Sequence, residues 1–416
     1  MVRTVAGMAM GSKKSEKKTI LWIYGLVLTS IGILLPVLPL YLSSLGIEPQ
    51  ELGLLFSVNM VAVAIGEMSW GRVIDKVGVG AALFTGTFLV AGLSSLFLVV
   101  HSLPLFFILF FFLGFSRAAI FITGRWYIAI HSHPSERASS MALLVAIMSG
   151  TRSVASVIGG VFVDGWGYPL ALSAAVVGPL LGGFVLLARR KRLSSSELDD
   201  KQTDLLVGDG IPTSFRRGLF YIVGIQGLVA ALNYFGFSIF LTYTSLFSTQ
   251  VIGTDATGAG ILFSIQGFVN LLVVIPIARL ADRKGKKLFM RMGLFGSTVA
   301  FLGIALSNTY AILMIFVVTF SLSFALFGPA AVALLSESVP KNRQGTAIGI
   351  YGVFEDVGMI LGSSLGGYFW ERWSPITTFL SGSFAAAIGA LASFKLIKEQ
   401  SAGDYQLINE NVSIDK

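Results

Sequence analysis

Apolar residues occur along this chain in long runs that short polar segments separate. A run of roughly 20 apolar residues is long enough to cross a bilayer as an α-helix. Such runs predict twelve membrane-spanning helices, over residues 19–42, 51–71, 79–100, 104–131, 138–163, 168–188, 218–246, 257–278, 288–306, 309–336, 344–369 and 374–396. The pattern therefore predicts an all-α, multi-pass membrane protein.

The longest polar interruption lies between the sixth and seventh predicted helices. Residues 189–217 are charged and rich in serine, which is typical of a flexible linker. We therefore divide the chain into an N-terminal six-helix half (1–188), a cytoplasmic linker (189–217), a C-terminal six-helix half (218–397) and a cytoplasmic tail (398–416).

The two halves contain an internal repeat. The segment "GLLFSVN" begins at residue 53 and "GILFSIQ" at residue 260, an offset of 207; "GRVIDKVG" and "ARLADRKG" begin at 71 and 278, the same offset. A repeat of six helices, an even number, keeps the same orientation in both copies. We expect two pseudo-symmetric halves related by an axis along the membrane normal, with a binding site between them near the midplane.

Composition agrees with a membrane protein and excludes a soluble enzyme. Charged residues make up 12% of the chain, about half the roughly 25% of a soluble domain, and the mean hydropathy is +0.80. With no cysteine, the chain offers neither disulfides nor thiolate metal sites. No nucleophile–base pair, metal-ligand cluster or nucleotide-binding loop is recognisable, so we expect no enzyme activity, metal or cofactor.

The positive charge is distributed unevenly. If the N-terminus lies inside, all Lys and Arg but four of the 30 fall in cytoplasmic segments or at their membrane edges; the four are Arg117, Arg125, Arg152 and Arg372. This bias places both termini in the cytoplasm and explains the net charge of +8 without nucleic acid. We expect a monomer in the plasma (inner) membrane whose partners are lipid and a small-molecule solute.

The repeated segments "GRVIDKVG" and "ARLADRKGKK" resemble the loop signature of the major facilitator superfamily of transporters, and "IGILLPVLPLYLSSLG" is similar to a first helix of that family. The first copy departs from the signature at Val79-Gly80, where the family has two basic residues, and the second begins with Ala278 instead of glycine. The overall likeness is to the drug:proton antiporter branch. Its glycine-rich signature is matched in the eleventh predicted helix rather than in the fifth, which supports antiport only weakly.

The two loop copies contain the candidate cytoplasmic gate. Its residues are Gly71, Arg72, Asp75, Lys76 and Gly78 in the first copy, and Arg279, Asp282, Arg283 and Gly285 in the second. From the residues alone, each copy is a turn between antiparallel helices, where glycine allows a backbone conformation that other residues avoid. The resemblance implies a gate latch, in which Asp75 faces the positive end of a helix in the other half.

Three charges fall near the middle of predicted helices: Arg117, Arg152 and Asp356. A charge inside a bilayer costs about 2.5–3.5 kcal/mol on insertion scales and is a functional candidate by default. No acid of the N-terminal half reaches the depth of the arginines, so we expect them to pair with Glu355 or Asp356 across the halves. Two alternatives stay open: an anionic substrate group, or a static network of carbonyls and water.

Other polar residues are candidates of a softer kind. Arg125 either pairs with Glu67 near the cytoplasmic boundary or extends toward the interface. Asn59, Asn233, Tyr234, Gln266 and Asn270 either line the central cavity or tie helices together.

The function that follows is secondary active transport of a small organic solute by alternating access. Glu355 and Asp356 are the candidate proton-coupling residues because a carboxyl group in apolar surroundings can carry a proton. The leading substrate class is lipophilic or drug-like compounds, exported in a process that we expect the proton gradient to drive. The alternatives are an organic-anion transporter that uses Arg117 and Arg152 directly, and a non-transporting membrane receptor or scaffold.

Overall fold

The computed structural model describes residues 2–131, 137–196, 213–340 and 343–396. Twelve α-helices make up these residues, with one π-helical turn and no strand. The helices are α1 (Val2–Ser44), α2 (Pro49–Val77), α3 (Val79–Leu96), α4 (Leu103–His131), α5 (Arg137–Trp166), α6 (Tyr168–Ser196), α7 (Thr213–Leu246), the π-helical η2 (Phe247–Val251), α8 (Ala256–Lys284), α9 (Lys286–Ala305), α10 (Tyr310–Glu337), α11 (Gln344–Arg372) and α12 (Pro375–Leu396).

The predicted fold class is confirmed, because each of these twelve α-helices contains a segment long and apolar enough to cross a bilayer. Large apolar side chains cover the outside; Phe295 on α9 and Phe384 on α12, for example, are 67% and 70% exposed. Such an apolar surface is stable in contact with lipid but unfavourable in contact with water.

Several helix ends differ from the predicted ones; α1, for example, begins at Val2 and not at residue 19. Helix α6 continues to Ser196 and α7 begins at Thr213, so both enter the segment predicted as a linker. The rest of that segment, residues 197–212, and the predicted tail lie outside the described residues.

The internal repeat is visible in the helix boundaries. Helices α2 to α6 begin at residues 49, 79, 103, 137 and 168, and α8 to α12 begin at 256, 286, 310, 344 and 375. Each pair differs by 207 residues, the offset found in the sequence. The turn glycines repeat too: Gly46 and Gly253 have φ of +83° and +81°, and Gly78 and Gly285 have +83° and +103°.

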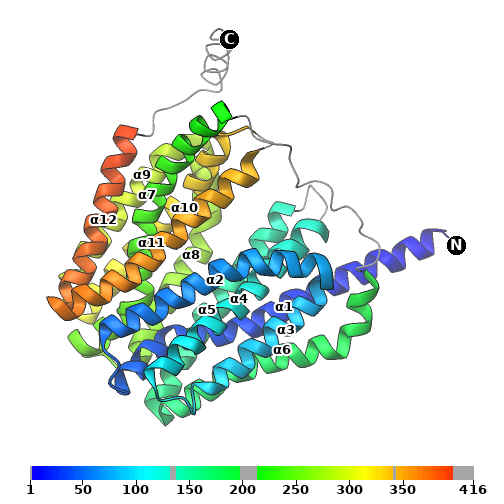
Figure 1. Cartoon of the computed structure of the whole chain (residues 1–416), viewed down its shortest axis with the longest axis horizontal. Coiled ribbons are helices and arrows are strands. Elements are labelled where there is room, and N and C mark those ends of the chain that lie inside the picture. The colour runs from blue at the N-terminus through cyan, green and yellow to red at the C-terminus, as the bar shows by residue number, and fades with distance from the viewer. Residues whose placement is uncertain (1, 132–136, 197–212, 341–342, 397–416) are drawn as a thin grey trace, which may run out of the picture.

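Helices α1–α6 form one half of the molecule and α7–α12 the other. The halves meet chiefly through α5 against α8 and α2 against α11. Figure 1 shows that their helices lie close at one end and diverge toward the other. We call these the closed end, which carries the α1–α2 and η2–α8 connections, and the open end, which carries the turns at Gly78 and Gly285.

Close contact at the closed end depends on glycine. A Cβ on Gly160 of α5 would collide with the backbone of Ala256 on α8, and one on Gly367 of α11 would collide with the backbone of Pro49 on α2. These contacts are related by the repeat, since Gly160 and Gly367 are equivalent positions. Without side chains, the helices approach closely enough for their backbones to touch.

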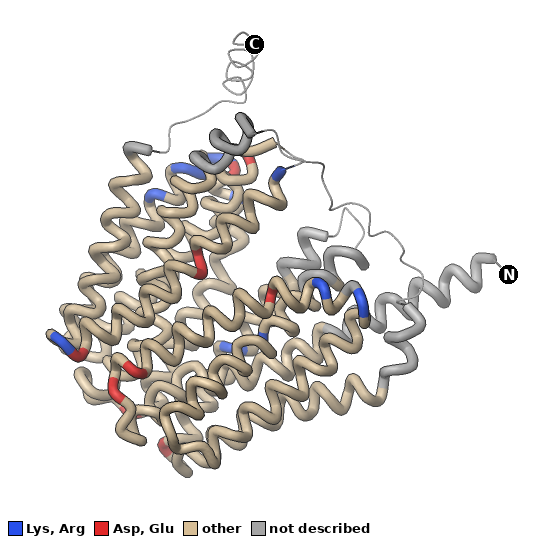
Figure 2. Tube along the Cα trace, viewed as in Figure 1, with Lys and Arg blue, Asp and Glu red and all other residues tan. Residues whose placement is uncertain are grey.

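The two ends differ in charge (Figure 2). Described residues near the closed end include five carboxylates, Glu48, Glu51, Asp164, Asp255 and Glu371, and one base, Arg372. Lys and Arg gather instead around the open end, where α8 and α9 alone contribute Arg279, Arg283, Lys284, Lys286, Lys287 and Arg291. This is the asymmetry that the sequence predicts.

Candidate functional site between the halves

Arg117 of α4 is held by an amide of its own half. Its Nη1 donates a hydrogen bond to Asn59 Oδ1 on α2 at 3.3 Å, and Asn59 Nδ2 donates to the carbonyl of Phe110 at 2.7 Å. The close approach of the two helices requires Gly114, because a Cβ there would collide with the Asn59 carbonyl. Arg117 Nε is buried and has no hydrogen-bond partner within the described structure.

Arg152 of α5 instead contacts the opposite half. Its Nη2 donates to Gln266 Oε1 on α8 at 3.1 Å. The Gln266 side chain is 1% exposed, so the bond is shielded from solvent. Asn59 and Gln266 are repeat equivalents, and each accepts a hydrogen bond from one of the two central arginines. The arginines themselves are close enough to repel each other.

The ion pair predicted between an arginine and Glu355 or Asp356 is not formed among the described residues in this conformation, in which the hydrogen bonds of Arg117 and Arg152 go to Asn59 and Gln266. The physical reason is that Asp356 lies on the side of the α2–α11 contact where the two halves separate. Helices α2 and α11 are joined where Ser57 Oγ donates to the Ile360 carbonyl at 2.9 Å and lies 2.8 Å from Ser363 Oγ. Asp356 lies one helical turn from Ile360 toward the open end, where the halves diverge.

Glu355 and Asp356 occupy different faces of α11. Asp356 is four residues from Ile360 and seven from Ser363, so it shares the face that meets α2 of the other half. Glu355 is three residues from Gly358 and seven from Gly362, both of which contact the backbone of α7 in its own half. Both carboxyl side chains are half-buried. Asp356 is thus the acid on the face toward the opposite half.

An apolar pocket lies beside Arg117. Its space for water-sized molecules is about 40 Å³, enough for a few waters or one end of a larger molecule. The lining residues are Ser30, Ile31, Leu34, Leu35, Leu38, Phe56, Asn59, Val90, Phe110, Leu113 and Arg117. Arg117 is the one charged residue among them, so the pocket combines an apolar wall with a cationic group whose Nε lacks an acceptor.

The C-terminal half has aromatic residues where the N-terminal half has arginine. The repeat equivalent of Arg117 is Phe324 of α10, which stacks on Phe237 of α7 with ring centroids 4.4 Å apart. Tyr234 contacts the same ring at 5.6 Å. The sequence singles out Tyr234 but not its aromatic partners, although the 207-residue offset links Arg117 to Phe324.

Of the other candidate amides, Asn233 is 1% exposed, and neither of its side-chain polar atoms has a hydrogen-bond partner within the described structure. Asn270 is half-buried on α8. Neither contributes to the pocket beside Arg117.

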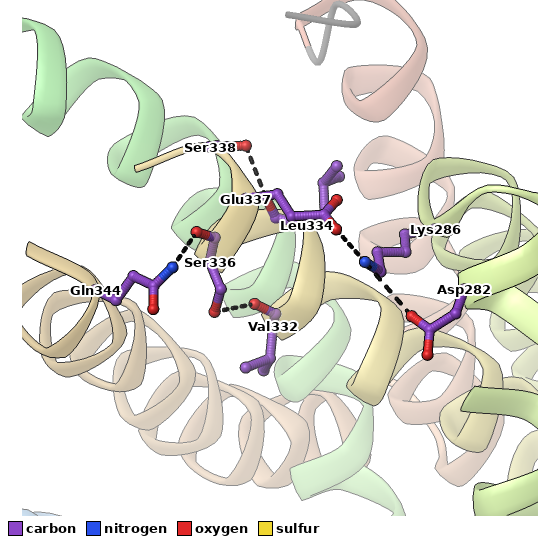
Figure 3. A network of polar contacts seen from close by, with 8 residues as sticks. All are labelled: Asp282, Lys286, Val332, Leu334, Ser336, Glu337, Ser338 and Gln344. Carbon is purple, nitrogen blue, oxygen red and sulfur yellow. Dashed lines mark hydrogen bonds and ion pairs between the residues drawn. The ribbon is translucent and has the colours of Figure 1, made fainter. Parts of the chain in front are cut away.

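At the open end, the second copy of the loop motif forms a local network (Figure 3). Lys286, at the start of α9, forms ion pairs with Asp282 at 3.4 Å and with Glu337 at the end of α10. Gln344 Nε2 donates to the Ser336 carbonyl at 2.7 Å and joins α11 to α10. Asp282 therefore contacts its own half here, while the basic residues Arg279 and Arg283 are exposed.

In the first copy, Gly71 packs near Ile122 of α4. A Cβ placed on the glycine would lie 3.7 Å from Ile122 Cδ1. Arg72 and Lys76 are exposed. The side chains of Asp75 and Arg125 lie outside the described residues, so the predicted roles of Asp75 as a latch and of Arg125 as a partner of Glu67 stay predictions.

Twelve membrane-spanning helices in two repeated halves, with Arg152 bonded across their interface and an apolar pocket beside Arg117, are the architecture of a membrane transporter. The sequence profile of the Major Facilitator Superfamily matches residues 20–254 and 226–409. The chain belongs to this family.

Relatives within the family include drug-resistance proteins. The chain is 24% identical over 361 residues to Multidrug resistance protein 2 of Bacillus subtilis, covering 82% of this chain and 85% of that protein. It is 23% identical over 355 residues to Quinolone resistance protein NorA of Staphylococcus aureus, covering 83% of this chain and 87% of that protein. Among solved structures, the nucleoside transporter NupG superimposes with a TM-score of 0.74 at 16% identity, covering 92% of this chain and 99% of that one. At that identity the superposition shows the shared fold.

Proposed function

We propose that this protein exports lipophilic solutes by alternating access and is driven by the proton gradient. The observation that carries the proposal is the apolar pocket beside Arg117, which helices α1 to α4 of the N-terminal half line. The names of the two relatives support a drug-like substrate class. The basic residues around the open end support placing that end, and both termini, in the cytoplasm.

The chemistry of the pocket supports a solute of a particular kind. Aliphatic and aromatic side chains bind an apolar body, and Arg117 Nε requires a hydrogen-bond acceptor. A buried donor without an acceptor costs about 1–3 kcal/mol, and more when it is charged. A solute that carries a carbonyl or a carboxylate on an apolar body removes this cost when it binds.

Asp356 is the coupling acid in this proposal. It lies on the face of α11 that meets the opposite half, one helical turn from the bond between Ser57 and Ile360. A carboxylate there is costly in an apolar environment, which favours proton uptake, and a protonated Asp356 permits movement of the halves. Glu355 faces its own half and has a structural role. The protein works as a monomer, with the bilayer and the solute as its partners and with no bound cofactor.

The test is transport by purified protein in liposomes with an imposed pH gradient and a fluorescent lipophilic dye. Asp356→Asn is expected to abolish gradient-driven dye movement, whereas Glu355→Gln retains it. Full gradient-driven transport by Asp356→Asn would contradict the coupling role. Absence of flux for any solute in the unmodified protein would favour the non-transporting receptor or scaffold.

A second candidate function is organic-anion transport. It is favoured by the two neighbouring arginines, whose hydrogen bonds within the described structure go to neutral amides. An anionic solute would supply the missing negative charge. A lipophilic anion and a lipophilic cation of the same size separate the candidates. An anion transporter moves only the anion and loses this activity in Arg117→Gln, whereas the exporter of lipophilic solutes also moves the cation.

A further inference from the structure

We propose that Asp164 and Glu371 are two pseudo-symmetric latches that hold the closed end shut, each by capping the first turn of a helix in the opposite half. The proposal rests on the alternating access of the proposed function, but on neither the solute nor the coupling ion.

The first latch joins α5 to α8. Asp164, near the end of α5, accepts hydrogen bonds from the backbone nitrogens of Ala256 and Thr257 at 3.0 and 2.7 Å. It also accepts one from Thr257 Oγ1 at 2.5 Å. Ala256 and Thr257 are the first two residues of α8, whose backbone N–H groups have no partner within the helix. A carboxylate of one half thus satisfies the exposed donors of the other.

The second latch joins α11 to α2. Glu371 Oε2 accepts a hydrogen bond from the backbone nitrogen of Gln50 at 3.3 Å. Gln50 is the second residue of α2, as Thr257 is of α8. Glu371 is 207 residues after Asp164, and Thr257 is 207 residues after Gln50. The repeat therefore produces the same contact twice, once in each direction across the interface.

Local geometry explains why a carboxylate is suited to both positions. The N-terminus of a helix carries partial positive charge and favours an anion. Gly160 and Gly367, four residues before each acid, let α5 and α11 touch the first residue of the capped helix. One helical turn therefore separates the glycine contact from the acid that follows it, and the acid reaches the first turn of α8 or α2.

The two latches differ in strength. Asp164 accepts three hydrogen bonds of 2.5–3.0 Å from the start of α8, whereas Glu371 accepts one bond of 3.3 Å from the backbone of α2. Glu371 also lies beside Glu48, another carboxylate. The α5–α8 latch is therefore the stronger of the two, and its loss is expected to shift the conformation more.

The experiment measures conformation without transport, so its failure is distinct from failure of the proposed function. The chain has no cysteine, and spin labels can be placed at His101→Cys and Asn308→Cys alone. These two positions are repeat equivalents, exposed at the closed end on opposite halves. Their distance distribution, measured by double electron–electron resonance, separates conformations in which this end is closed from those in which it is open.

Asp164→Ala is expected to raise the ratio of open to closed populations roughly five- to tenfold, as the loss of charge-assisted hydrogen bonds at a partly exposed site implies. Glu371→Ala is expected to raise it about twofold, because it removes one long bond. Asp255→Ala is the matched control: Asp255 caps the same helix α8 through Gly258 N at 2.7 Å, but within its own half. Asp255→Ala is expected to leave the distance distribution unchanged.

An unchanged distance distribution in the Asp164→Ala, Glu371→Ala double variant would overturn the proposal. So would an equal shift in Asp255→Ala, because that result would assign the effect to the stability of α8 itself. A thermal unfolding measurement on each variant identifies any that fails to fold, and Asp164→Asn, which keeps the side-chain shape, then replaces Asp164→Ala.

Discussion

Arg117 and Arg152 are close enough to repel each other, and each donates a hydrogen bond to a neutral amide. In a low-dielectric interior, two positive charges held in this way repel each other more strongly than they would in water. Gln266 is one of the residues that join the halves, because its bond to Arg152 links α8 to α5.

Changing the charge of that amide gives the first prediction. Gln266→Glu is expected to raise the unfolding temperature and slow turnover, because it replaces the neutral acceptor of Arg152 by a carboxylate and so forms an ion pair between the halves. Gln266→Leu is expected to destabilise the protein by about 1–3 kcal/mol, since it leaves a buried cation without its acceptor. Thermal unfolding and transport assays measure both effects. Unchanged turnover in Gln266→Glu would show that this contact does not limit the cycle.

The second prediction at this scale concerns pH. The pKa of Glu48 is raised above its ordinary value of 4.5. The largest cause is the nearby negative charge of Glu371, followed by a hydrogen bond with Glu371 and by burial. The charge of Glu51 makes a smaller contribution. Opening the closed end separates Glu48 from Glu371 and lowers this pKa again. The closed conformation therefore binds the proton more tightly.

The stabilisation of the closed conformation by this proton is fully present below the ordinary pKa and is lost as the pH rises through the raised value. We expect the spin-label distance between positions 101 and 308 to favour the closed conformation in acid. Glu48→Gln is expected to remove that part of the pH response. If Glu48→Gln titrates like the unmodified protein, the Glu48–Glu371 pair is not its source.

Among the structural elements, α11 illustrates how glycine positions define an interface. Gly367 touches the backbone of α2, whereas a Cβ on Gly349 would meet nothing within 4 Å. Gly367→Val is therefore expected to prevent closure and increase the open population at the closed end, because its side chain cannot fit between the backbones. Gly349→Val is the control on the same helix. Equal distance distributions in the two variants would contradict this role of Gly367.

The sequence predicted the helices well and their contacts less well. Helix α8 starts at Ala256 and α11 at Gln344, within one residue of prediction, because apolar runs and repeat offsets depend only on positions along the chain. The expected pairing of a central arginine with Glu355 or Asp356 is not formed within the described part of the chain in this conformation, where both arginines bond to amides. Two residues at the same depth in two helices can face different directions, and their depth does not show where the halves diverge. The Asp164 latch was missed because Asp164 lies at a helix end, where a carboxylate is unremarkable in a sequence.

At the scale of the whole molecule, the proposed alternating access requires the closed end to separate once in each transport cycle. Ser43 and Gln250, another pair 207 residues apart, are hydrogen-bonded across the halves at 3.0 Å. A short bifunctional, reducible thiol reagent bridging Ser43→Cys and Gln250→Cys is expected to stop transport, and reduction is expected to restore it. Each single-cysteine variant treated alike is the control. Sustained transport in the bridged protein would contradict alternating access through this end.

The unequal strength of the two latches has a consequence for the order of events. The contact between α11 and α2 has one long backbone bond, from Gln50 to Glu371, and it brings the carboxylates of Glu48 and Glu371 together. We expect this contact to separate before the contact between α5 and α8. The first gap then forms along a single flank of the molecule. A lipophilic solute leaving by that gap would enter the adjacent lipid leaflet sideways before any axial channel to water exists.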